Sequence, residues 1–337
     1  MLQVKVLFIS FFCSVLFFEE PVNAVSNGEL DFRKVIEENS QYVPTKDMCT
    51  RRILGGQTVD IEEVPYQVLI LKCDDDYWEL ICGGAIVTDR YVVSAAHCFQ
   101  TKGMESSYRV VAGTGQAYMC WRRTSEQNVN SRKTFTSEIW RQILNLFTHT
   151  YYSKSEHQND FAVLELDIPV NFSRFVQPIP MMKTSYGIEL KDGDLCMVTG
   201  FGETEKAKMS RYLRMVCLPF VSRVKCANTF GFRRLTENQF CAGDFGKDCC
   251  KGDSGGPITF RGYLVGIVSY GQGGCGQGPG IFTKISAYTT GELIPLSLSQ
   301  SCVMLSLNIL KVVFFVFSIF VHNFVVTNFF VFNRFCA

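Results

Sequence analysis

Four histidines are the chain's candidate general bases at neutral pH, and one of them stands out by its neighbours. His149 and His157 lie in a polar stretch, and His322 lies close to the C-terminus. His97 instead follows the apolar run 91–93 within the string Ser-Ala-Ala-His-Cys, whose small residues leave room for a reacting group. A histidine at the end of a strand is more often structural, so His97 alone only suggests acid–base chemistry.

A second motif, Gly252-Asp-Ser-Gly-Gly-Pro257, could carry a nucleophile. The glycines that flank Ser254 let the backbone approach a ligand closely and turn N–H groups toward it. Turns made of glycine and serine are common, but this six-residue string is far more specific than such a turn. The motif therefore indicates a hydroxyl nucleophile beside backbone hydrogen-bond donors.

Taken together, nine motifs make the sequence resemble the trypsin-like serine proteases of the chymotrypsin fold. They occur in the family's order across about residues 53–290, and His97, Asp160 and Ser254 follow one another at separations of 63 and 94 residues. The matching strings are Ile53-Leu-Gly-Gly56, Val64-Pro-Tyr-Gln67, Cys82-Gly-Gly84, Ser94-Ala-Ala-His-Cys98, Asn159-Asp-Phe-Ala162, Gly200-Phe-Gly202, Cys241-Ala-Gly243, Asp253-Ser-Gly-Gly-Pro257 and Val268-Ser-Tyr-Gly271.

The resemblance implies an all-β fold of two six-stranded antiparallel β-barrels with the active site in the cleft between them. It implies a catalytic triad of His97, Asp160 and Ser254. His97 would accept the serine proton, and Asp160 would orient and stabilise the histidine. The backbone N–H groups of Gly252 and Ser254 would form the oxyanion hole.

The resemblance also assigns substrate binding to Asp248, Ser269, Gly271 and Gly280. Asp248 lies six residues before the serine, where the family has the base of its primary specificity pocket, and a carboxylate there pairs with arginine or lysine. The two glycines match pocket walls that leave room for a long cation. Cys249 stands where serine or alanine is usual, and a thiol is a weaker hydrogen-bond partner, which favours arginine over lysine.

Residues 25–52 are polar and charged, with few candidates for a core, and are interpreted as a leader. The leader ends in the pair Arg51-Arg52, immediately before the apolar Ile53. A dibasic pair is usually a solvated loop, but exposed loops are also where chains are cut. By resemblance, cleavage after Arg52 frees the Ile53 amine to pair with Asp253 and order the site.

Fifteen cysteines indicate an oxidising compartment. Without the predicted signal peptide and tail, 12 remain, and the resemblance implies the pairs Cys82–Cys98, Cys226–Cys241 and Cys250–Cys275. The partners of six others stay open, because connectivity cannot be deduced from sequence. Among the alternatives are a Cys196–Cys217 pair, a Cys73–Cys120 pair, a leader tether through Cys49 (with Pro180 where the best-known tethering cysteine would be) and a free Cys249 thiol.

The elements that must position these residues are predominantly strands. Short β-rich runs separated by turn residues are typical of a barrel or sandwich, and they cover 67–71, 84–87, 91–93, 109–112, 162–166 and 264–268. Only 137–144 has a helical pattern. By resemblance a closing helix is expected from Ser286, although Pro295 disfavours its continuation.

Composition sets the remaining limits. The formal net charge of +1 argues against nucleic-acid binding through bulk charge, and 47% hydrophobic residues exclude wholesale disorder. Residues 1–24 have the basic start, apolar run and small residues of a signal peptide, so the protein is expected to be secreted and extracellular.

The peptidase domain is assigned to 53–295 and an atypical hydrophobic tail to 296–337. Within the tail, 312–332 is long enough to span a bilayer, and a membrane anchor, a removed lipid-anchor signal and a gene-assembly or splicing artefact remain alternatives.

The expected partners are protein or peptide substrates with arginine or lysine at the cleaved bond, together with protein protease inhibitors. No cofactor is expected, and no metal, because Thr114 and Gln116 stand where the calcium loop of some relatives has carboxylates. Two rival hypotheses are a non-catalytic binding protein on the protease fold and a membrane-tethered processing protease. A chain that keeps all three triad residues favours an active enzyme over the first rival.

Overall fold

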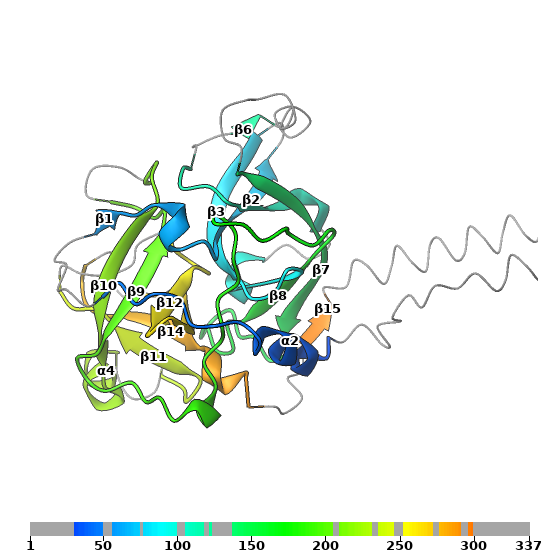
Figure 1. Ribbon diagram of the computed structural model, residues 1–337. Coiled ribbons are helices and arrows are strands. Elements are labelled where there is room, and N and C mark those ends of the chain that lie inside the picture. The colour runs from blue at the N-terminus through cyan, green and yellow to red at the C-terminus, as the bar shows by residue number, and fades with distance from the viewer. Residues whose placement is uncertain are drawn as a thin grey trace, which may run out of the picture.

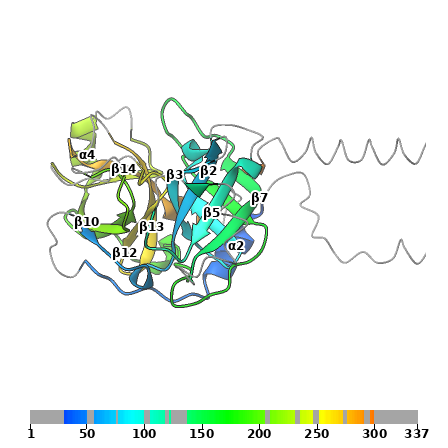
Figure 2. The ribbon, with the colours of Figure 1, turned by 90° about the horizontal axis from the view of Figure 1, so that it is seen from above.

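Two β-barrels lie side by side in the computed structural model of the protein (Figures 1 and 2). The α-helices are α2 (Phe32–Asn39) and α4 (Arg223–Phe230). Between the strands are the short 3-10 helices η2 (Ile61–Glu63), η3 (Ala96–Cys98), η4 (Glu105–Ser107), η5 (Thr184–Tyr186) and η6 (Ile285–Ala287). The structure describes residues 30–49, 56–74, 77–99, 105–117, 121–122, 137–204, 209–230, 235–245, 252–271, 276–290 and 296–298.

The first barrel has six antiparallel strands in the order β7-β5-β2-β3-β4-β8, and pairing of β7 with β8 closes it. Its strands are β2 (Gln67–Asp74), β3 (Tyr77–Ile86), β4 (Tyr91–Ser94), β5 (Tyr108–Ala112), β7 (Ile139–His149) and β8 (Ala162–Leu166). Two short strands extend the sheet, β6 (Trp121–Arg122) beside β3 and β15 (Leu296–Leu298) beside β7.

The second barrel has the order β10-β11-β14-β13-β12-β9, and pairing of β9 with β10 closes it. Its strands are β9 (Leu195–Gly200), β10 (Arg214–Val221), β11 (Gln239–Ala242), β12 (Pro257–Phe260), β13 (Tyr263–Tyr270) and β14 (Gly280–Lys284). The short β1 (Gln57–Thr58) lies beside β10. Every strand pair in both barrels is antiparallel, so the expected architecture of two six-stranded barrels is confirmed.

One expectation about helices is wrong, and a second is not met within the described residues. The stretch 137–144 falls largely in the long strand β7, because pairing with β5 and β8 overrides its weak helical pattern. After β14 the described chain forms the 3-10 helix η6, which ends at Ala287, and no α-helix follows within residues 288–290 or 296–298. A closing helix from Ser286 is therefore not found in the described part of the chain.

Alternating side chains of the strands fill each barrel, as the period of two predicts. One buried cluster occupies the first barrel and includes Val68, Ile70 and Leu164. Another occupies the second and includes Val198, Ile258 and Phe282. A third cluster joins residues of both barrels and includes Tyr66, Phe161 and Tyr288. The shared core keeps the two barrels in a fixed relation, which a site between them requires.

The sequence suggested that the leader is a polar extension, but in the structure part of it forms a helix with a buried face. Residues 32–39 form α2, whose N-cap Asp31 accepts a hydrogen bond from the backbone N–H of Arg33. Phe32, Val35, Ile36 and Asn39 are buried on one face of this helix. These four positions follow the i, i+3, i+4, i+7 spacing of an amphipathic helix, but the charged residues between them conceal so short a stripe.

Three disulfides join described cysteines: Cys49–Cys217, Cys82–Cys98 and Cys226–Cys241. The last two are the pairs that the resemblance implied. Cys217 pairs with the leader, so the alternative Cys196–Cys217 pair is wrong, and the leader tether runs through Cys49 to β10. Cys196 is buried without a disulfide. The predicted Cys250–Cys275 pair, Cys120 and Cys249 lie outside the described residues.

The two ends of the sequence add little to the described structure. The predicted signal peptide 1–24 and the segment 312–332 lie outside the described residues. None of the helices in the described part is both long and apolar enough to cross a membrane.

Candidate active site

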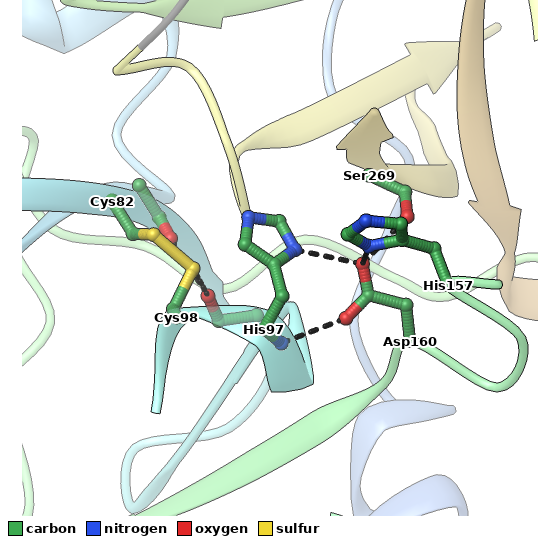
Figure 3. The surroundings of a disulfide bond; sticks show 8 residues. Cys82, His97, Cys98, His157, Asp160 and Ser269 are labelled. Atoms are coloured by element: carbon green, nitrogen blue, oxygen red, sulfur yellow. Dashed lines mark hydrogen bonds and ion pairs between the residues drawn. A yellow bond between two sulfur atoms is a disulfide. The ribbon is translucent and has the colours of Figure 1, made fainter. Parts of the chain in front are cut away.

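His97 and Asp160 meet where two paired strands of the first barrel reach the same edge. His97 lies in η3, just after β4, and Asp160 precedes β8, and Ser94 pairs with Ala162 across these strands. Figure 3 shows the result: the Asp160 carboxylate accepts the backbone N–H of His97 at 2.8 Å and faces its Nδ1 at 2.8 Å. With Nδ1 engaged in this way, Nε2 is the ring nitrogen available to a substrate or nucleophile.

A third donor reaches Asp160 from the second barrel. Ser269, on β13, donates its hydroxyl to Asp160 Oδ2 at 2.5 Å. The Asp160 side chain is fully buried, and burial alone would raise the pKa of its carboxyl. The hydrogen bonds from His97 and the electrostatic attraction between the two side chains, together with the Ser269 bond, outweigh burial and lower the pKa below its usual value. Asp160 is therefore a buried carboxylate that remains ionised at neutral pH.

The turn before β8 is shaped by an unusual backbone conformation. Asn159 has a φ of 52°, a left-handed geometry that asparagine tolerates better than most residues. Its side chain donates to the carbonyl of Tyr151 and accepts from Asn238 of the second barrel. The hydroxyl of Thr283, on β14, donates to the backbone carbonyl of Asp160 at 2.9 Å. Residues of both barrels thus hold the position of this aspartate.

Ser254 lies on a turn that packs against the residues preceding His97. Its carbonyl accepts the N–H of Gly83 at 2.8 Å. Gly255 has a φ of +75°, and a Cβ there would lie 2.2 Å from Ser94 Oγ, so only glycine fits. Among the described residues, the N–H groups of Gly252 and Ser254 have no hydrogen-bond acceptor. These two N–H groups are the donors that the resemblance assigns to the oxyanion hole.

Asp253 points away from this turn, into the second barrel. Its Oδ1 accepts the backbone N–H of Gly202 at 2.7 Å. A Cβ on Gly200 or Gly202 would lie within 2.3 Å of the Asp253 carboxylate, so these glycines leave the space that the carboxylate fills. Its predicted partner Ile53, together with Arg52, lies outside the described residues.

The other predicted substrate-binding residues are only partly described. Gly271 directly follows β13 and Gly280 begins β14, and Tyr270 pairs with Ile281 in the register between them. The two glycines therefore lie opposite each other at one end of this strand pair. Asp248 and Cys249 lie outside the described residues, so the base of the predicted specificity pocket is not seen.

His157 also belongs to the site, although the sequence indicated only that it lies in a polar stretch. Its ring stacks on the ring of Tyr270, with centroids 4.8 Å apart. It also lies edge-on to the ring of His97, with centroids 5.8 Å apart (Figure 3). Its Nδ1 is buried without a hydrogen-bond partner in the described part and lies 4.0 Å from Asp160 Oδ2. Burial lowers the pKa of His157, so it is neutral at neutral pH. Its position three residues before Asp160 was the available signal.

Two groups at the site contain metal-ligand atoms close together. In the group of Cys82, His97 and Cys98, the two sulfurs are joined in a disulfide and offer no thiolate. In the group of His97, His157 and Asp160, the carboxylate is already engaged by His97 and Ser269. These contacts form a hydrogen-bond network around the Asp160 carboxylate.

Comparison with known proteins agrees with this geometry. The family model described as Trypsin matches residues 53–290. A vitellin-degrading protease of Bombyx mori is 34% identical over 72% of this chain and 85% of its own length. Trypsin 5G1 of Aedes aegypti is 31% identical over 70% of this chain and 82% of its own. A CLIP domain-containing serine protease of Bombyx mori is 31% identical over 74% and 72%, respectively.

Proposed function

The chain belongs to the trypsin family of serine proteases, and from this membership we propose that it is a secreted endopeptidase, made as a zymogen, that cleaves after arginine or lysine. The observation that carries the proposal is the buried Asp160 carboxylate bonded to His97, with the Ser254 turn packed against Ser94 and Ala95, which lie just before His97 in the chain.

In the proposed reaction Ser254 attacks the scissile carbonyl while His97 accepts its proton through Nε2 and then passes it to the leaving amine. Asp160 holds the ring and stabilises the imidazolium. The N–H groups of Gly252 and Ser254 stabilise the oxyanion, and the loss of one such donor costs about 3 kcal/mol of barrier. No step requires a cofactor.

Asp248 is proposed to pair with the cationic side chain of the substrate, which passes between Gly271 and Gly280. A peptide-library cleavage profile of the protein cut after Arg52 tests this. We expect cleavage after arginine first and lysine second, and Asp248→Ser to remove that preference. Ser254→Ala controls for contaminating proteases. A profile without basic residues at the cleaved bond would contradict the proposal.

Activation is proposed to follow cleavage between Arg52 and Ile53. The segment that contains this bond is fixed at both described ends to one strand, because Cys49 bonds to Cys217 and Gln57 pairs with Met215 of β10. Arg52→Gln should leave the protein inactive on a small peptide substrate, with Arg51→Gln as a matched control. Full activity of Arg52→Gln would refute the scheme.

A non-catalytic protein on the same fold is the rival from another class. After cleavage at Arg52, an organophosphate serine reagent should label Ser254 in an enzyme and leave such a protein unlabelled. Membrane fractionation of expressing cells separates a secreted product from one tethered through 312–332.

A further inference from the structure

Residues 30–49 of the leader pack against the two barrels and contribute to their shared core. The apolar face of α2 is buried, with Phe32 and Val35 exposing 2% and 1% of their surface. Further along, the backbone N–H of Thr45 donates to the carbonyl of Gly262 in the β12–β13 hairpin. A Cβ on Gly262 would lie 2.0 Å from the Thr45 carbonyl oxygen, so leader and hairpin touch directly. Cys49 then bonds to Cys217.

Asn39 makes this docking specific. Its amide nitrogen donates to the carbonyls of Val87 at 2.7 Å and Ile179 at 2.9 Å, and its oxygen accepts the N–H of Met181 at 2.7 Å. Asn39 is 1% exposed, so these backbone groups cannot turn to water while the helix is in place. Removing the leader would expose an apolar surface and leave three backbone groups without their present partner.

The leader also lies behind the candidate active site. Phe32 contacts the ring of Phe161 edge-on, with centroids 5.4 Å apart, and Phe161 stacks on Tyr288 at 4.5 Å. Phe161 directly follows Asp160 in the chain. The side chain of Phe32 therefore supports the backbone that carries the carboxylate of the triad.

We propose that Phe32 of the leader, which the Cys49–Cys217 disulfide and the packed helix α2 hold in place, is a positioning residue for Asp160. This rests on the proposed cleavage after Arg52. The cut falls between Cys49 and Gln57, so it leaves the leader attached through the disulfide to Cys217 and through α2. The retained leader completes the shared core and, through the contact of Phe32 with Phe161, supports the backbone next to Asp160.

Retention is tested on the full chain after limited cleavage, with the new Ile53 amino terminus confirmed by sequencing. The leader should stay with the protein in denaturant and be released only when reductant is added. In Cys49→Ser/Cys217→Ser, which lacks the covalent link, it should still co-elute in gel filtration under native conditions. Adding Val35→Asp should release it, whereas Lys34→Asp, on the exposed face of α2, should not.

The outcomes separate this inference from the proposed function. If no Ile53 terminus forms and the uncut protein is active, the activation scheme fails. If the terminus forms but the leader leaves the parent protein without reductant, or leaves the double variant under native conditions, retention is refuted. If the released protein keeps its melting temperature and kcat, the leader has no structural role.

The role of Phe32 is tested against a partner on the same buried face. Phe32→Ala and Val35→Ala should both lower the melting temperature, but only Phe32→Ala should lower kcat, by about tenfold, with KM unchanged. Phe32→Tyr, which keeps the ring, should restore kcat. Equal kcat values for the two alanine variants would overturn the positioning role while leaving the retention test intact.

Discussion

At the scale of single residues, several hydrogen-bond donors converge on the carboxylate of Asp160. Asp160 accepts from the backbone and ring of His97 in one barrel and from Ser269 in the other. Because it is fully buried, each bond is made in a medium of low dielectric, where it is stronger than at the surface. The charge of this residue is thus maintained by neighbours from both halves of the molecule.

We predict that Ser269→Ala lowers kcat by about ten- to a hundredfold, because a hydrogen bond to a charged group contributes about 1.5–3 kcal/mol. Asp160→Asn should lower kcat by about 10⁴, since it stabilises the wrong histidine tautomer. Steady-state kinetics on an arginine peptide substrate measures both, with the exposed Ser155→Ala as control. A normal kcat for Ser269→Ala would show that the Ser269 hydroxyl is not needed to hold the Asp160 carboxylate.

His149 should make the protein sensitive to acid. It is buried and its Nδ1 accepts the N–H of Tyr151, and burial lowers its pKa below 6.5. The folded state then binds fewer protons than the unfolded state, so the free energy of unfolding falls as pH drops below about 6.5. His149→Asn keeps an acceptor but cannot be protonated, and denaturant unfolding at several pH values should show a shallower decline. An unchanged slope would exclude His149 as the cause.

At the scale of elements, the site depends on how closely the turn that carries Ser254 approaches strand β3. A Cβ on Gly83, in β3, would lie 3.1 Å from Gly256 Cα and 3.2 Å from the Gln67 amide nitrogen. Gly83→Ala should therefore displace the Ser254 turn and lower kcat at least about tenfold, as measured on a peptide substrate. Gly115→Ala, whose Cβ would meet nothing closer than 3.7 Å, is the matched control.

The packing of α2 depends on one polar side chain, that of Asn39. Asn39→Leu should lower the free energy of unfolding by about 2–4 kcal/mol, because three buried backbone groups lose their partner. Chemical denaturation measures the change, and Glu37→Ala on the exposed face of α2 should have little effect. Equal stability of Asn39→Leu and the parent would mean that these groups find other partners.

At the scale of the whole molecule, close packing of the second barrel determines the reactivity of Cys196. This thiol is fully buried, and burial raises its pKa far above the usual value. We expect an alkylating reagent at mildly alkaline pH to leave Cys196 unmodified in the native protein and to modify it after unfolding. Peptide mapping by mass spectrometry identifies this cysteine among the others, and labelling of the native protein would contradict the burial.

Sequence alone determined the features that local chemistry dictates. The runs at 67–71, 91–93 and 162–166 alternate or are continuously apolar, and all three form strands. The motifs around His97, Asp160 and Ser254 are short and specific, so they could be recognised without any structure. The pairs Cys82–Cys98 and Cys226–Cys241 followed from the same resemblance.

Only the tertiary structure decided what long-range contacts control. The stretch 137–144 became strand because its neighbours supplied hydrogen-bond partners. The leader helix has four buried positions among charged residues, a signal too short to reveal the surface that would receive it. Cys49 found Cys217 across 168 residues, and His157 came to lie beside His97. No local pattern encodes such distances, because they arise when two barrels and a leader pack into one core.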